Sequence, residues 1–477
     1  MEVHVSLSRS GKLVEQVYRQ LKEAILDGRF RAGEPLPSTR ELAARLSVSR
    51  NTVMSAFGRL VAEGFLSGRA GSGTFVNETS PAERRRAPAG RALVPRKIWS
   101  ALTREPAHHP AAQFDYRVGA PDATLFPWDA WRGAVARQLR GRRPFVGPPP
   151  PDGEPTLRAA IARHIGLSRA VRASADDVLV CTGAHEAFDL ITRVLVEPGA
   201  CVAVEEPGYP SLRWGLEAHG ARVVSVRVDE DGLDVQSLPD DARVVFVTPS
   251  HQFPLGVRMS LARRTALLAW SERNGAAIVE DDYDSEFRFG GRPVEPLQSL
   301  DRRGRVLYVG TFSKVLLPTL RVGFLVAPPS LMPTLRTAKR ITDSYGPLEI
   351  HRALAEFIDE GLFARHLRRL LRAYGERRER LLSAVERHLG NLLVALPSSA
   401  GLHTALWCKD ANVDVDAWAQ RAMDARVAVE SLNMYYAYRP RAGLVLGYGL
   451  IPASKIDEGI ARLAASYPAP RRRAAAR

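Results

Sequence analysis

Residues 306–314 read VLYVGTFSK, and this stretch decides the fold of the chain: four apolar residues followed by a polar cluster that ends at Lys314. Residues 277–284 read AIVEDDYD and repeat the arrangement, with the acidic residues placed after the apolar ones. Short, β-branched apolar runs separated by helix-sized segments are typical of buried strands in a largely parallel sheet. The sequence therefore predicts an α/β domain with helices on both faces of the sheet.

Further apolar runs support this prediction and extend the sheet. They lie at Val178 to Val180, Cys201 to Val204, Val244 to Val247 and Gly323 to Val326. Residues that follow parallel strands meet at one edge of the sheet, where α/β proteins bind ligands. Thr182 to His185 follow the first of these runs and open a helix, whose backbone N–H groups can hold a phosphate.

The polar clusters at this edge contain the groups that pyridoxal 5′-phosphate (PLP) needs. The cofactor requires a Schiff-base lysine, a carboxylate that keeps the ring nitrogen protonated, a phenol near the ring hydroxyl and donors for the phosphate. Lys314, Asp281 and Tyr283 supply the first three groups. The expected phosphate donors are Thr311, Ser313, Arg321 and the amides of Gly183 and Ala184. Acidic loops and Ser-Lys pairs are usually surface features, so the prediction depends on their combination.

The first 76 residues have the pattern of a winged helix-turn-helix. A helix ends at Gly28, a capping box of Ser38 and Glu41 starts a helix through Leu46, and a third helix covers Arg50 to Glu63. Inward-facing residues are expected at Leu13, Val17, Leu21, Ile25, Val53, Phe57, Leu60 and Val61. Phe65 to Val76 are glycine-rich between apolar ends, which predicts a β-hairpin.

In such a domain the third helix enters the major groove of double-stranded DNA, with its N-terminal side chains near bases and phosphates. The expected contacts are Ser49, Arg50, Asn51 and Thr52, with Arg40 and Arg69 on the DNA backbone from the flanks. A capped helical hairpin without DNA-binding function is the alternative. The net charge of +15 favours a polyanionic partner, and more than half of the positive excess lies in the first 113 residues.

Longer stretches resemble two known families. LPSTRELAARLSVSRNTV (36–53) resembles the DNA-binding domain of the GntR regulators, which implies contacts from Arg40, Ser49, Arg50 and Thr52; Met54 stands where some relatives have a basic contact. GEPTLRAAIARH (153–164), EEPGYPS (205–211), TPSHQFPLG (248–256), EDDYDSEFRF (280–289) and GTFSK (310–314) resemble fold-type I aminotransferases.

The fusion as a whole resembles the MocR/GabR subfamily of GntR regulators. The resemblance to this subfamily implies a homodimer whose cofactor sites lie near the subunit interface, with each DNA-binding domain reaching across to its partner. The aminotransferase resemblance implies that Tyr209 stacks on the cofactor ring and that a smaller C-terminal domain follows the large cofactor domain. An aminotransferase-like domain would then sense a small amine, or PLP itself, and a winged helix would bind DNA.

Two departures from aminotransferases favour sensing over catalysis. Gly443 to Tyr448 are apolar where those enzymes place the arginine that binds the substrate carboxylate, although Arg439 or Arg441 can be considered as substitutes. Phe253 stands where they place an asparagine against the ring hydroxyl. We expect the domain to be used for sensing, although Lys314 can still perform the proton transfer of a residual transaminase activity. An aminotransferase with an appended DNA-binding domain is the alternative function.

The predicted organisation is a winged helix-turn-helix at 1–76, a linker at 77–113, a PLP-binding effector domain at 114–465 and a basic tail at 466–477. The linker and tail each carry three consecutive arginines. Cys181, Cys201 and Cys408 lack metal-site spacing, so we expect free thiols and no metal. No signal-like or membrane-spanning apolar segment occurs in the sequence, so we expect a cytoplasmic protein without a membrane partner.

Overall fold

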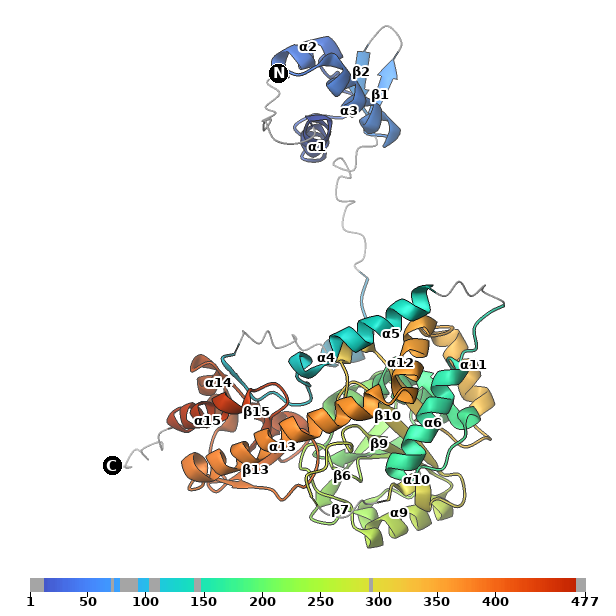
Figure 1. The fold of residues 1–477 in the computed structure, drawn as a ribbon, viewed down its shortest axis with the longest axis vertical. Helices are drawn as coiled ribbons and strands as arrows, with labels where there is room; N and C mark the ends of the chain where they lie inside the picture. Colours follow the sequence, from blue (N-terminus) through green and yellow to red (C-terminus); the bar gives the residue numbers. More distant parts are fainter. Residues whose placement is uncertain are drawn as a thin grey trace. The chain divides into compact units, whose positions relative to one another are not determined.

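The computed structural model describes residues 13–69, 73–77, 93–102, 112–140, 147–290 and 295–468. The chain divides into two compact units, Met1–Arg96 and Lys97–Arg477, whose elements are labelled in Figure 1. The arginine runs of the expected linker and tail lie outside the described residues. Inside the expected linker, residues 97–102 form a short helix that belongs to the second unit and contacts α8 (Pro210–His219).

The first unit is a winged helix. Its elements are α1 (Leu13–Leu26), α2 (Thr39–Leu46), α3 (Arg50–Ala62), β1 (Leu66–Arg69) and β2 (Gly73–Val76). The two strands pair antiparallel, as the hairpin prediction requires. Val17, Leu21, Ile25, Val53 and Leu60 are almost completely buried and form the core between the helices.

Side chains at the helix ends fix the turn between α2 and α3. Ser38 Oγ accepts a hydrogen bond from the backbone N–H of Glu41, while the Glu41 carboxylate pairs with Arg45 in place of closing the capping box. Ser47 ends α2 with a left-handed backbone (φ 55°), and Ser49 caps α3. This sharp turn sets the direction in which α3 leaves α2.

Two of the expected inward positions are wrong. Leu13 is 39% exposed because it is the first residue of α1, beyond the reach of the core. Val61 is 45% exposed because it directly follows the buried Leu60, and neighbouring residues on a helix point about 100° apart. The third helix also ends at Ala62, one residue before the predicted end.

The second unit contains the predicted parallel sheet. Its strands follow the order β4-β11-β10-β9-β8-β5-β6-β7, and β11 and β7 are antiparallel to their neighbours. The strands are β4 (Val178–Cys181), β5 (Cys201–Glu206), β6 (Arg222–Asp229), β7 (Gly232–Leu233), β8 (Ala242–Val247), β9 (Ala277–Asp282), β10 (Val306–Thr311) and β11 (Gly323–Val326). All six apolar runs are strands. The acidic residues 280–282 belong to β9 and do not follow it, because the strand continues into the sheet edge.

Helices cover both faces of this sheet, as predicted. The helices are α4 (Lys97–Leu102), α5 (Trp128–Arg140), α6 (Pro155–Arg169), α7 (Ala184–Leu195), α8, α9 (Leu261–Asn274), α10 (Leu297–Leu300), α11 (Met332–Thr342), α12 (Leu348–Asp359), α13 (Leu362–Leu389), α14 (Val415–Asp424) and α15 (Ile456–Ala465). Val178 and Val180 pack in the core with α6 and α12, whereas Leu179 and Cys181 pack with α7. Alternate residues of one strand therefore belong to different cores.

A smaller antiparallel sheet follows α13 in the chain. Its strand order is β12-β13-β16-β15, and a separate parallel pair joins β3 to β14. The strands are β12 (Leu393–Ala395), β13 (His403–Cys408), β15 (Glu430–Ser431), β16 (Gly443–Gly447), β3 (Phe114–Asp115) and β14 (Val427–Ala428). Among the described helices, none is long and apolar enough to cross a membrane.

A buried ion pair connects α6 to the acidic end of β9. Arg169 Nε donates to Asp282 Oδ2 at 2.8 Å, and the Tyr308 hydroxyl donates to the same oxygen. Both charged side chains are more than nine-tenths buried. Removing one partner would leave the other charge without compensation in the core.

We therefore expect Arg169→Met to lower the free energy of unfolding by about 3–5 kcal/mol. The control is Arg163→Met, since Arg163 lies on the same helix in an exposed pair with Asp359 and should contribute less than about 1 kcal/mol. Denaturant unfolding of both variants measures the difference. Equal losses would show that the buried pair has no special importance.

Candidate functional site

The predicted cofactor residues surround one cavity of about 410 Å³ at the carboxyl edge of the large sheet. The ends of β4, β9 and β10 form one wall, and residues of the smaller C-terminal sheet and of the segment at Val118–Gly119 form the other. All of the predicted cofactor residues line it: Gly183, Ala184, Tyr209, Asp281, Tyr283, Thr311, Ser313, Lys314 and Arg321. The sequence alone thus identified residues that lie far apart in the chain and close together in space.

Lys314 lies inside this cavity with its amine held in place. Lys314 Nζ donates to the backbone oxygen of Gly119 at 2.7 Å. Burial lowers the pKa of Lys314, against the raising effect of Asp284 and Asp281. A lowered pKa increases the neutral fraction of the amine, which is the form that attacks an aldehyde. Gly119 has a left-handed backbone, and a Cβ there would stand 2.7 Å from Nζ, so this position requires glycine.

Asp281 carries the clearest sign of a missing partner. Its Oδ1 atom is buried and has no hydrogen-bond partner in the described part of the chain. Burial, and then the charge of Asp282, raise the pKa of Asp281 to about 8. A buried carboxyl group without a partner is costly, and a protonated ring nitrogen would supply one. Asp281 therefore fits the place of the PLP pyridine ring.

Another part of the cavity wall has the features of a phosphate cradle. Gly183 precedes α7 with φ 118°, and a Cβ on it would lie 3.3 Å from the Arg321 guanidinium. Thr311 Oγ1 accepts from the Ser313 backbone N–H at 3.2 Å, which turns the chain after β10. Free amides at a helix start, an arginine and hydroxyl groups together match a phosphate.

A buried lysine stabilises the turn that forms this cradle. Lys339 of α11 donates to Glu186 Oε1 at 2.7 Å, and Glu186 Oε2 accepts from the backbone N–H of Thr182 at 2.6 Å. Lys339 is 1% exposed. The ion pair therefore holds the turn that presents Gly183 to the cavity.

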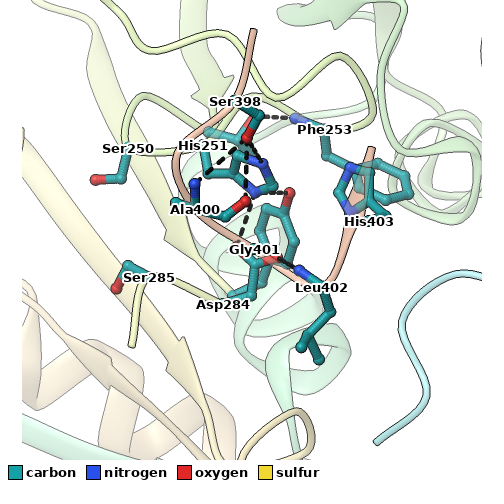
Figure 2. A network of polar contacts seen from close by, with 12 residues as sticks. Ser250, His251, Phe253, Asp284, Ser285, Ser398, Ala400, Gly401, Leu402 and His403 are labelled. Carbon is teal, nitrogen blue, oxygen red and sulfur yellow. Dashed lines mark hydrogen bonds and ion pairs between the residues drawn. The ribbon is translucent and has the colours of Figure 1, made fainter. Parts of the chain in front are cut away.

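Tyr283 is held by a hydrogen-bonded network that the sequence analysis did not predict (Figure 2). The Tyr283 hydroxyl lies 2.9 Å from His251 Nδ1, which also lies 3.0 Å from Asp284 Oδ1. His251 Nε2 contacts Ser398 Oγ at 3.1 Å. The only sequence signal was the polar His251-Gln252 pair after the β8 strand, and the partners come from segments more than 30 residues away.

His251, Asp284 and His403 bring one candidate metal-ligand atom each to within 4.8 Å of one another. However, His251 Nδ1 already contacts both Asp284 and Tyr283, and His403 Nε2 donates to the backbone oxygen of Pro254 at 3.0 Å. Burial lowers the pKa of His403 to about 3, so this ring is neutral. The group is best explained as a network that orients Tyr283.

Aromatic side chains form the wall around Tyr209. Its hydroxyl lies 3.1 Å from His185 Nε2, and its ring centroid lies 5.8 Å from that of Phe253. Phe253 also packs edge-on against Tyr283 at 5.6 Å. The asparagine-to-phenylalanine departure thus leaves an apolar contact beside Tyr283 in place of a hydrogen-bond donor.

Neither proposed substitute for the carboxylate-binding arginine lines the cavity. Arg439 and Arg441 are exposed, and the Arg441 guanidinium lies 4.4 Å from the centre of the Trp407 ring. Both arginines lie in the segment just before β16. The strand β16 itself is buried along its whole length. The cavity wall near β15 instead presents Glu430, whose Oε1 accepts from the Val118 backbone N–H at 3.0 Å.

The predicted DNA contacts lie on the surface of the first unit around the start of α3. Arg40, Ser49, Arg50, Asn51 and Arg69 are exposed, and Thr52 is half-buried. Ser49 Oγ accepts from the Thr52 backbone N–H at 3.1 Å, so Ser49 also serves as the helix cap. Arg50 Nε donates weakly to Thr39 Oγ1 at 3.5 Å, and its remaining donors face solvent.

Comparisons with known proteins agree with both halves of the chain. Residues 13–76 match the gntR family of bacterial regulatory proteins, and residues 116–441 match the class I and II aminotransferases. The probable rhizopine catabolism regulatory protein MocR of Rhizobium meliloti is 38% identical over 95% of this chain and 93% of its own length. This chain is a GntR-family transcriptional regulator of the MocR/GabR type.

Other relatives of the regulator are HTH-type regulators of similar length. TauR of Rhodobacter capsulatus is 36% identical (95% of this chain, 96% of its own), and the pyridoxine biosynthesis regulator PdxR of Corynebacterium glutamicum is 35% identical (94% and 93%). Among solved structures, an archaeal alanine:glyoxylate aminotransferase has a TM-score of 0.70 at 28% identity, covering 74% of this chain and 90% of its own. The fold-type I assignment is thereby confirmed.

The raised pKa of Asp281 leads to a pH-dependent stability. In the cofactor-free regulator, the folded state keeps Asp281 protonated up to about pH 8, whereas the ordinary pKa is 3.8. Between these values the unfolded state loses its proton first, so stability contributed by this group falls as pH rises. We expect the melting temperature of the wild type to fall relative to Asp281→Asn from pH 5 to pH 9. A difference in melting temperature between the two proteins that stays constant from pH 5 to pH 9 would contradict the raised pKa of Asp281.

Proposed function

We propose that the regulator holds PLP covalently on Lys314 and that a small amine bound at the same cavity changes its affinity for DNA. The observation that carries this proposal is the buried Asp281 Oδ1 atom, which has no hydrogen-bond partner in the described part of the chain and lines the same cavity as Lys314, whose pKa is lowered. When bound, PLP supplies an electrophilic carbon with which a primary amine can combine.

Each group of the chain has a definite task in this proposal. Asp281 would accept a hydrogen bond from the ring nitrogen, and its negative charge would keep that nitrogen protonated. Tyr283, held by His251, would donate to the ring hydroxyl, and Tyr209 would pack on the ring. Arg321 and the Gly183 turn would hold the phosphate, and Lys314 would bind the aldehyde carbon of the cofactor.

The cavity wall supports a sensing role more than a catalytic one. Transamination requires a ligand held rigidly for proton transfer at its α-carbon, whereas sensing requires only that two conformations differ in affinity. Among the described cavity residues, Arg321 is the single arginine, and the phosphate would occupy it. The intact Asp281, Tyr283 and Lys314 set favours the second candidate, an aminotransferase with an appended DNA-binding domain.

The parts of the chain would divide the work. We propose DNA binding by residues 1–76, a connection at 77–113 and effector binding by residues 114–465, in a homodimer that acts in the cytoplasm. In a third version of this proposal, PLP itself is the effector that changes the affinity for DNA, and no amine is needed. The similarity to a regulator of pyridoxine biosynthesis supports this version.

The first test is the visible absorbance of the regulator after incubation with PLP. We expect a band that Lys314→Ala abolishes and that the control Lys409→Ala, at an exposed position, retains. A stable shift of the band with one amine from a panel, together with changed DNA affinity, would identify the effector class. Turnover of that amine with a keto acid would favour the enzyme, and absence of any Lys314-dependent band would refute the cofactor proposal.

The second test concerns the DNA-binding face. We expect Arg50→Ala to weaken binding to a duplex selected by the wild-type regulator from random sequences, by about 1–3 kcal/mol, because Arg50 would contact base edges. Arg19→Ala removes the same charge from α1, where the side chain is exposed. Fluorescence anisotropy at fixed salt compares the two variants. Equal losses would mean that only net charge matters.

A further inference from the structure

A second polar pocket lies beside the network of Figure 2, on the flank away from Phe253 and His403. It opens at the carboxyl ends of β8 and β9, next to the cofactor cavity. Its polar side chains are three arginines and three serines: Arg169, Arg258, Arg288, Ser250, Ser285 and Ser399. The proposed function assigns no role to any of these six residues, so the pocket requires a separate explanation.

The described side chains that line the pocket include three arginines and no carboxylate. Arg169 is paired with Asp282, but within the described ranges neither Arg258 nor Arg288 forms an ion pair. Arg288 is half-buried, and its Nε donates only to the backbone oxygen of Ser285 at 3.1 Å. Burial, and then the like charge of Arg169, lower the pKa of Arg288, against the raising effect of Asp282 and Glu286. An anion in the pocket would act in the same direction as these carboxylates and stabilise the charged guanidinium.

Hydroxyl groups in the same pocket are also available to a ligand. Ser285 is 5% exposed, and its Oγ forms no hydrogen bond with the described part of the chain. Ser250 Oγ accepts from Arg169 Nη2 at 2.7 Å, which leaves its own proton to donate. Figure 2 shows both hydroxyls on the same flank, directed away from His251. The Ser285 hydroxyl therefore lines the pocket as a donor that a ligand can use.

We propose that this pocket binds a phosphate group, carried by a small phosphorylated molecule or present as inorganic phosphate. Guanidinium groups match the oxygens of a phosphate in pairs, and hydroxyl donors complete its coordination. The mixture of arginine and serine donors around one small pocket fits a tetrahedral oxyanion better than a flat carboxylate ligand.

The pocket and the cofactor cavity share a wall. Each of its serines is the chain neighbour of a network residue: Ser250 of His251, Ser285 of Asp284 and Ser399 of Ser398. Asp284 Oδ2 accepts from the Leu402 backbone N–H at 3.2 Å, and Leu402 lines the cofactor cavity. A phosphate on one side of the wall can therefore change the position of Tyr283 on the other. This coupling rests on the proposed function, whereas binding itself does not.

The binding test uses inorganic phosphate and the full chain with Arg321→Gln, which disables the phosphate cradle of the cofactor cavity. Calorimetry at an ionic strength held constant with potassium chloride should show phosphate binding. Adding Arg288→Gln should weaken this affinity at least about tenfold, since a charge-assisted hydrogen bond is lost. Arg258→Gln should have a smaller effect because Arg258 is exposed, and Arg273→Gln, an exposed position outside the pocket, should have none.

Glycerol phosphate and a short DNA duplex distinguish the source of the phosphate group. Binding of glycerol phosphate that Arg288→Gln weakens supports a phosphorylated metabolite, and preference for inorganic phosphate supports the free ion. The proposal is overturned if phosphate gives the same heat as chloride at equal ionic strength. It is also overturned if Arg288→Gln leaves the phosphate affinity unchanged. Arg288-dependent binding of the duplex without binding of either small phosphate also overturns it, because the pocket would then be a DNA contact.

The coupling test uses PLP-loaded regulator with the natural Arg321. Phosphate should shift the cofactor absorbance band, and Arg288→Gln should abolish the shift. An unshifted band despite bound phosphate refutes the coupling and leaves the binding site intact. Failure to form any Lys314-dependent band refutes the proposed function instead. Whether the second pocket binds phosphate is then decided by calorimetry alone.

Discussion

The structure depends on how it compensates a concentration of buried carboxyl groups at one edge of its sheet. Glu205, Glu280 and Glu286 have pKa values raised to about 7 by burial, and Asp281 is raised further. Asp282 is matched by Arg169, and Asp284 by His251 and a backbone N–H. Among the described residues, Glu205 Oε1, Asp281 Oδ1 and Glu286 Oε2 are buried without a hydrogen-bond partner, and of these three carboxyl groups only Asp281 lines the cavity that contains Lys314. The unpartnered oxygen of Asp281 therefore lies where a bound ligand would reach it.

Sequence patterns predicted the local parts of this arrangement well. Apolar runs identified the strands that carry Asp281 and Thr311 and the strand that precedes Gly183, because a buried parallel strand needs continuous apolar residues on both faces. The strand β6 was missed, since its sequence RVVSVRVD alternates charged and apolar residues and lies near the edge of the sheet. The winged helix was predicted for a similar reason: its helix spacing and serine caps are local signals.

Contacts between distant segments could not be predicted in the same way. The His251–Ser398 contact joins residues 147 positions apart, and the Lys314–Gly119 contact joins residues 195 apart. Periodicity carries no information on such pairs, because they depend on how the smaller C-terminal sheet meets the large one. Residue chemistry supplied most of the cofactor residues and the family resemblance added Tyr209, but neither revealed Glu430 on the cavity wall or the arginines that line a pocket with Ser285.

Sensing requires less of this cavity than catalysis does. Thermodynamic linkage between ligand binding and DNA binding expresses the requirement as a ratio of affinities. An effector shifts a two-state equilibrium only by the ratio of its affinities for the two states; moving it from 1:99 to 99:1 requires about 10⁴-fold preference. Any effector that changes DNA affinity by a given factor must have its own affinity changed by DNA by the same factor. The loss of the carboxylate clamp is consistent with this logic, since a regulator gains nothing from holding its ligand at the geometry of a transition state. Under the proposed function it needs only a cavity with two arrangements of different ligand affinity, and Tyr283 with its network would be the part of the wall that differs between them.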